Sequence, residues 1–101
     1  MLTSRQITNL AHILVLGPLL LGIGFGYIPP SQYIVGLGIG VLIYHIFMTL
    51  KSGFNWMRAI HVLAVAPTLI IYGYTGCPYA RDASTLLGGA AIAYHTARLL
   101  Q

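Results

Sequence analysis

Acidic residues are almost missing from this chain, and charged residues are few in general. Asp82 is the only acidic residue among 101, and charged types make up 6% of the sequence against 57% hydrophobic residues. A soluble domain carries about 25% charged residues. Acid–base catalysis and nucleophile activation need convergent polar groups, which the sequence hardly offers. We therefore expect a non-enzymatic protein without catalytic residues or a soluble domain.

Cysteine and basic residues are scarce as well. Cys77 is the only cysteine, so an internal disulfide is excluded. Five basic residues give a formal net charge of +4. They are too scattered for a nucleic-acid surface, and we expect no nucleic-acid partner. The positive charge is better explained by basic residues that orient a membrane protein in its bilayer.

Long apolar segments are what the chain does have. A membrane helix needs about 20 mostly apolar residues, with a range of about 17–25. Prolines, glycines and polar residues separate four such segments. The predicted spans are about 7–28, 33–50, 56–74 and 84–100. Ser84 or Asp82 is expected to cap the last helix.

The basic residues predict how the chain is oriented. With four spans, both termini and the middle loop lie on one side of the membrane. That side carries Arg5, Lys51, Arg58 and Arg98, whereas the other carries only Arg81. The positive-inside rule then places both termini on the cytoplasmic side.

A pattern of histidine, proline and glycine occurs twice. His12, Pro18, Gly24 and Pro29 are matched 49 positions later by His61, Pro67, Gly73 and Pro78. Gly38, Tyr44 and His45 are matched 50 positions later by Gly88, Tyr94 and His95. We predict an internal duplication. Residues 1–101 would form a single membrane domain made of repeat 1–51 and repeat 52–101.

The duplication predicts the architecture. Each repeat holds two spans, so both repeats enter the membrane in the same orientation, related by an axis along the membrane normal. The expected fold is all-α, an integral membrane four-helix bundle built from two tandem helical hairpins with pseudo-two-fold symmetry. Pro18 and Pro67 each remove a helical hydrogen bond and favour a bend.

The four histidines are the candidate functional residues. The predicted topology places them in one layer near the cytoplasmic face, and ionisable residues inside spans suggest function. One interpretation is structural, with neutral rings that hydrogen-bond nearby groups. A second is binding of haem b or a metal ion, since imidazole is a ligand for both. The candidate ligands are His12, His45, His61 and His95, paired as His45 with His95 or His12 with His61. Gly38 and Gly88 would leave room for a flat ring.

Three functions therefore stay open. The first is a structural or assembly component of a membrane complex or virion membrane. The second is an electron carrier that binds haem or a metal. The third is a small proton or ion channel gated by histidine. The expected partners are the lipid bilayer and either further copies of the chain or other membrane proteins, because the loops are short.

The repeated segments also resemble a known group. The stretches "AHILVLGPLLLGIGFG" and "AIHVLAVAPTLIIYGYTG", followed by "GVLIYH" and "GAAIAYH", resemble small duplicated membrane proteins encoded by large DNA viruses of algae and protists. The resemblance covers about residues 9–100. It implies the two-hairpin topology and a viral origin, and it carries no activity.

Overall fold

The computed structural model describes residues 1–101, and every regular element in it is helical. Four continuous helices follow one another along the chain. The first is α1 (Ser4–Ala11), η1 (His12–Leu16) and α2 (Gly17–Gly24). The second is α3 (Gln32–Ser52), the third is α4 (Trp56–Ile60), η2 (His61–Val65) and α5 (Ala66–Thr75), and the fourth is α6 (Pro78–Leu99). The all-α fold with four helices is thus confirmed.

Local sequence signals set most of the helix ends. Thr3 and Gln6 form a capping box, in which each side chain accepts a hydrogen bond from the other's backbone N–H. Ser31 caps α3 and Asn55 caps α4 through their side-chain oxygens. Gly76 ends α5 at φ 63, a left-handed conformation that suits glycine.

The start of the last helix differs from the prediction. α6 begins at Pro78, where a missing N–H costs nothing because the first helical N–H groups have no helical partner. Ser84 lies inside α6 and is fully buried, and its hydroxyl donates to the carbonyl of Leu20 at 2.7 Å. The prediction that Ser84 or Asp82 caps this helix was wrong.

Three of the four helices are long and apolar enough to cross a membrane. These are Ser4–Gly24, Gln32–Ser52 and Trp56–Thr75. The predicted fourth span lies in α6, which is not among the three. α6 contains Arg81, Asp82 and Arg98 besides several small and hydroxyl residues, and these lower its hydropathy.

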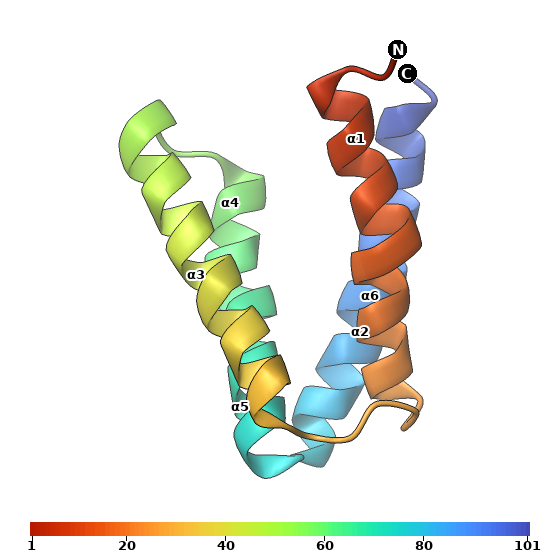
Figure 1. The fold of residues 1–101 in the computed structure, drawn as a ribbon, viewed down its shortest axis with the longest axis vertical. Helices are drawn as coiled ribbons and strands as arrows, with labels where there is room; N and C mark the ends of the chain where they lie inside the picture. The colour runs from red at the N-terminus through yellow and green to blue at the C-terminus, as the bar shows by residue number, and fades with distance from the viewer. The chain divides into compact units, whose positions relative to one another are not determined.

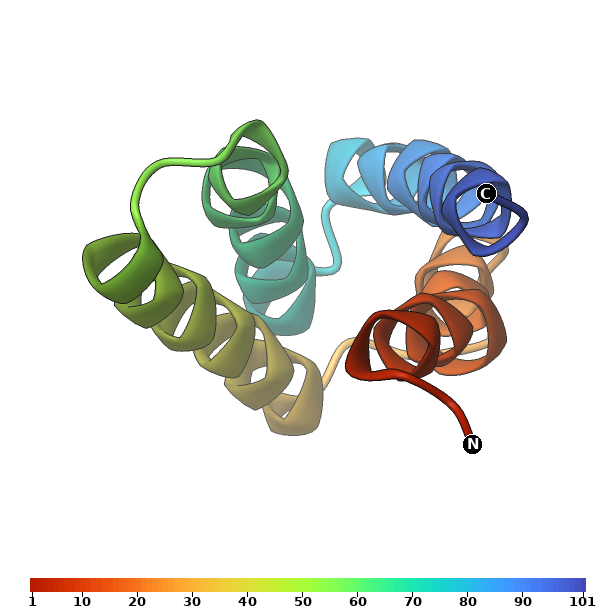
Figure 2. The same cartoon turned by 90° about the horizontal axis from the view of Figure 1, so that it is seen from above.

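The helices form two compact units. Unit 1 comprises Met1–Ile28 and Asp82–Gln101, and unit 2 comprises Pro29–Arg81. In unit 1 the first helix runs beside α6, and in unit 2 α3 runs beside η2 and α5 (Figures 1 and 2). Each unit therefore combines a helix of one predicted repeat with a helix of the other.

This pairing differs from the tandem hairpins expected within each repeat. In unit 2, only residues 53–55 connect α3 to α4, and such a short connection makes the two helices antiparallel neighbours. In unit 1, the small residues of α6 bring it close to α2. A side chain at Gly88 would meet the carbonyl of Gly17 at 3.0 Å and the Cβ of Leu20 at 3.0 Å.

The two prolines are accommodated by π-helical turns. η1 ends just before Gly17, whose N–H donates to the carbonyl of His12. η2 ends just before Ala66, whose N–H donates to the carbonyl of His61. Pro18 and Pro67 directly follow these two N–H donors. A proline has no N–H, and its ring clashes with the carbonyl four residues earlier, so a wider i→i+5 turn before it relieves both problems.

Most of the core of each unit lies along the contact between its two paired helices, and Ala80 at the start of α6 adds to the core of unit 2. In unit 1, Leu20 and Ile23 of α2 are almost completely buried, and the carbonyl of Leu20 accepts a hydrogen bond from Ser84 of α6. In unit 2 the buried apolar residues are Ile34, Val35, Ala66, Leu69, Tyr72 and Ala80. The remaining faces of the helices carry exposed apolar side chains, such as Leu63 at 77% exposure.

Candidate functional site: two stacked histidine pairs

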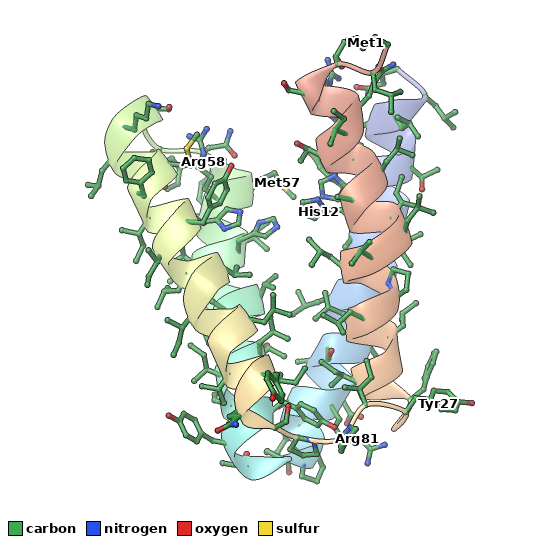
Figure 3. All side chains as sticks on the ribbon, in the orientation of Figure 1. Met1, His12, Tyr27, Met57, Arg58 and Arg81 are labelled. Carbon is green, nitrogen blue, oxygen red and sulfur yellow. The ribbon has the colours of Figure 1, made fainter.

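The first histidine pair lies in unit 1. The rings of His12 and His95 stack with their centroids 4.1 Å apart and their planes 26° from parallel. His95 is buried, and its Nδ1 hydrogen-bonds the side-chain oxygen of the buried Asn9 at 2.9 Å. Nδ1 of His12 hydrogen-bonds the carbonyl of Thr8 at 2.8 Å. Figure 3 labels His12 on the first helix.

The second histidine pair lies in unit 2. The rings of His45 and His61 stack with their centroids 4.3 Å apart and their planes 11° from parallel. Nδ1 of His45 hydrogen-bonds the carbonyl of Val41 at 2.8 Å, and Nδ1 of His61 hydrogen-bonds the carbonyl of Met57. Both rings are half-buried. The two units thus carry the same kind of pair.

The hydrogen bonds fix which ring nitrogen carries the proton. A carbonyl or amide oxygen only accepts hydrogen bonds, so Nδ1 must be the donor in all four rings. In a neutral imidazole, Nε2 is then the nitrogen that carries the lone pair. This is how a ligating histidine is usually oriented, with its other nitrogen bonded to an oxygen. In each pair, Nε2 is therefore the ring nitrogen with the chemistry of a ligand atom.

The two rings of one pair do not form an axial pair for haem in this arrangement. A haem with two imidazole ligands holds one ring on each face of the porphyrin, whereas these rings lie face to face. No group of three or more histidine, cysteine or acidic side chains that could hold a metal ion is present. The predicted pairs, His45 with His95 and His12 with His61, combine different units and stay predictions.

The two predicted glycines contact the partner helix. A Cβ at Gly38 would lie 3.0 Å from Leu69 Cβ and 3.1 Å from the carbonyl of Ala66. Gly88 stands in the same relation to Leu20 and Gly17. The space beside both glycines is therefore filled, which differs from the expected gap for a flat ring. Gly38 and Gly88, which are 50 positions apart, therefore share a close contact with the partner helix rather than a space for a ligand.

Tyrosines flank both pairs. Tyr44 meets His45 edge to face, with ring centroids 5.1 Å apart, and Tyr94 meets His95 in the same way at 5.1 Å. Sequence reasoning found these tyrosines through the repeated Tyr-His motif. It missed Asn9, the buried partner of His95, because Asn9 has no equivalent in the second repeat, where Arg58 occupies the matching position.

No family model matches the chain, and comparisons with curated proteins and with solved structures found no match. The resemblance to duplicated viral membrane proteins therefore stays a prediction. The site must be interpreted from its own geometry.

Proposed function

We propose that the chain is an integral membrane protein with a non-enzymatic, structural or assembly role in its membrane. The observation that carries this proposal is the apolar surface of its span-length helices. At most 22% of each candidate span is buried within the protein. In water, each large apolar side chain left exposed forgoes about 1.5–3 kcal/mol of burial free energy, and lipid removes that cost.

The aromatic residues of unit 2 support a bilayer location. Tyr33 and Tyr74 are exposed at one end of the unit, and Phe54 and Trp56 are exposed at the other. The 21-residue α3 is about 31 Å long at 1.5 Å per residue. That length matches the hydrocarbon core of about 30 Å, whose two interfaces favour tyrosine and tryptophan.

The charges of each unit support the proposed orientation. Arg58 and Arg81 lie at opposite ends of unit 2 (Figure 3), and Lys51 lies near the Arg58 end. In unit 1, Arg5 and Arg98 line one pocket at the end that holds both termini. Met1 and Tyr27 mark the two ends of this unit (Figure 3). The ends richer in basic residues would face the cytoplasm.

The membrane proposal predicts two measurable results. Alkaline carbonate and high salt should leave the protein in the membrane fraction, because its apolar contacts do not depend on charge. An impermeant maleimide should label Cys77 from one side of sealed vesicles. It should label the variant Cys77→Ser/Ser52→Cys only from the opposite side. Release by carbonate, or labelling of both cysteines from the same side, would contradict the proposal.

We also propose the internal duplication as the origin of the two units. Its support is that matching residues make matching contacts. The π-helical turns begin at His12 and His61, 49 positions apart. Gly24 would clash with Thr85 if it carried a side chain, and Gly73 with Val35, and these partners are 50 positions apart. The two helices of each unit would then come from different repeats.

Ligand binding through Nε2 is the second candidate function, and the fixed Nδ1–H donors favour it. If one imidazole binds haem, titration of the purified protein with haemin should give a Soret band that His45→Ala abolishes. Tyr44→Phe serves as the control, because it keeps the neighbouring ring and the histidine. A colourless protein whose haemin spectrum does not depend on the histidines would exclude this candidate.

A further inference from the structure

A polar pocket lies at the end of unit 1 where the first helix begins and α6 ends. Its walls come from the first helix and from the C-terminal residues. The lining residues are Thr3, Arg5, Gln6, Asn9, Arg98, Leu99 and Gln101. Two guanidinium groups therefore share one small pocket with three carboxamide side chains.

The pocket lining contains no aspartate or glutamate side chain to pair with the two arginines. Asp82, the only acidic side chain of the chain, is 16 residues before Arg98 on the same helix, about 24 Å away at 1.5 Å per residue. Arg5 donates one hydrogen bond to the side-chain oxygen of Gln101, at 3.4 Å. Arg98 is half-buried, and its side chain has no hydrogen bond or ion pair.

The carboxamides add donors to the pocket. The side-chain oxygen of Gln6 accepts from the N–H of Thr3, and that of Asn9 accepts from His95. Gln101 likewise uses its oxygen, to accept from Arg5. In all three side chains the acceptor is occupied and the NH2 group is left as a donor. The pocket therefore offers positive charge and N–H donors and suits an anion.

The matching positions of unit 2 do not carry a pair of arginines. Phe54 and Met48 stand where unit 1 has Arg5 and Arg98. Arg58 stands where unit 1 has Asn9, and it donates to the carbonyl of Gly53 at 2.9 Å. The paired arginines are thus a feature of one unit, which distinguishes them from the basic residues that merely orient the chain.

From this chemistry we propose that the Arg5–Arg98 pocket binds a phosphate monoester. Two guanidiniums balance the charge of about −1.5 to −2 that a phosphate monoester carries at neutral pH. Their planar forks match its oxygen atoms. The ligand is either the headgroup of an anionic lipid at the membrane surface or a soluble phosphate. The lipid alternative rests on the proposed membrane function, whereas the soluble one does not.

The test measures binding in two settings. In detergent micelles, calorimetric titration with glycerol 3-phosphate probes the pocket without a bilayer. In nanodiscs, native mass spectrometry compares retention of phosphatidic acid with that of phosphatidylglycerol, a phosphate diester, at equal surface charge. We expect glycerol 3-phosphate to bind in micelles, or phosphatidic acid to bind about ten-fold more tightly than phosphatidylglycerol in nanodiscs, or both.

The variants tie this binding to the pocket. Arg98→Gln and Arg5→Gln should each weaken monoester binding about ten-fold or more, since each removes a charged hydrogen-bond donor. Arg98→Lys should fall between wild type and Arg98→Gln. Lys51→Gln, which removes the same charge from unit 2, should bind like wild type. Helix content by circular dichroism confirms that each variant is folded.

The outcomes separate the alternatives. Binding of glycerol 3-phosphate in micelles supports a pocket for phosphate monoesters in general, and retention of phosphatidic acid alone supports a lipid site. Equal retention of monoester and diester, with Arg5→Gln and Arg98→Gln no weaker than Lys51→Gln, would overturn the proposal. Membrane insertion, measured separately by carbonate extraction, is unaffected by either result.

Discussion

Gly88→Ala is expected to lower the free energy of unfolding by about 1–3 kcal/mol, the usual cost of overpacking a close contact. A Cβ at this position would lie 2.9 Å from the backbone nitrogen of Leu21 and 3.0 Å from the carbonyl of Gly17. Backbone atoms cannot move aside without shifting the helix, so α2 and α6 would have to separate. The measurement is unfolding of the detergent-solubilised protein in a denaturing detergent.

The neighbouring glycine supplies a matched control. A Cβ at Gly89 would meet nothing within 4 Å. Gly89→Ala should therefore be neutral, or stabilising by about 0.5–1 kcal/mol, because alanine loses less backbone entropy in a helix. The same contrast is expected in unit 2 between Gly38→Ala and Gly40→Ala. Equal changes in the free energy of unfolding for Gly88→Ala and Gly89→Ala would contradict the close contact between α2 and α6.

Asn9→Leu is expected to cost about 1–3 kcal/mol, because it removes the acceptor for the buried Nδ1–H of His95. Both residues are at least 92% buried, with exposures of 6% for Asn9 and 8% for His95. Water therefore has little access to replace the lost hydrogen bond. The free energy of unfolding of the variant, measured as for the glycines, tests this expectation.

A double-mutant cycle separates the hydrogen bond from the loss of packing. Asn9→Leu/His95→Leu should cost less than the two single changes added together, since neither polar group is then left unpaired. His45→Leu is the control in unit 2, because Nδ1 of His45 bonds a carbonyl within its own helix. Strictly additive effects at Asn9 and His95 would contradict the buried pair.

The sequence predicted the four helices and indicated that the four histidines belong together. Runs of apolar residues predicted four helices, since only a helix satisfies its backbone hydrogen bonds within one apolar segment. The repeated motif drew attention to all four histidines, and the structure brings them together as two pairs. The repeated pattern also drew attention to Gly38 and Gly88, but the predicted space for a flat ring was wrong, because both glycines contact the partner helix.

The choice of helix partners could not be predicted in the same way. The proposed duplication would make the same contacts available within a repeat and between repeats, because Gly38 would correspond to Gly88 and Leu20 to Leu69. Periodicity cannot distinguish these alternatives. The short connection at residues 53–55 favours pairing between repeats, because it makes α3 and α4 antiparallel neighbours.

The polar pocket of unit 1 also could not be predicted from the sequence pattern. Arg5 and Arg98 are separated by almost the whole chain, and the sequence alone indicates for both only a role in membrane orientation. Nothing in either local sequence indicates that they share a pocket. Only the pairing of the first helix with α6 brings them together.

That pairing also sets the order in which the molecule can be completed during synthesis. Unit 2 is formed by one continuous stretch of the chain, so it can assemble as soon as Arg81 has left the ribosome. Unit 1 depends on contacts between distant residues, such as Leu20 with Ser84 and Asn9 with His95, 64 and 86 positions apart. The packing face of the first helix therefore stays uncovered until α6 has been synthesised.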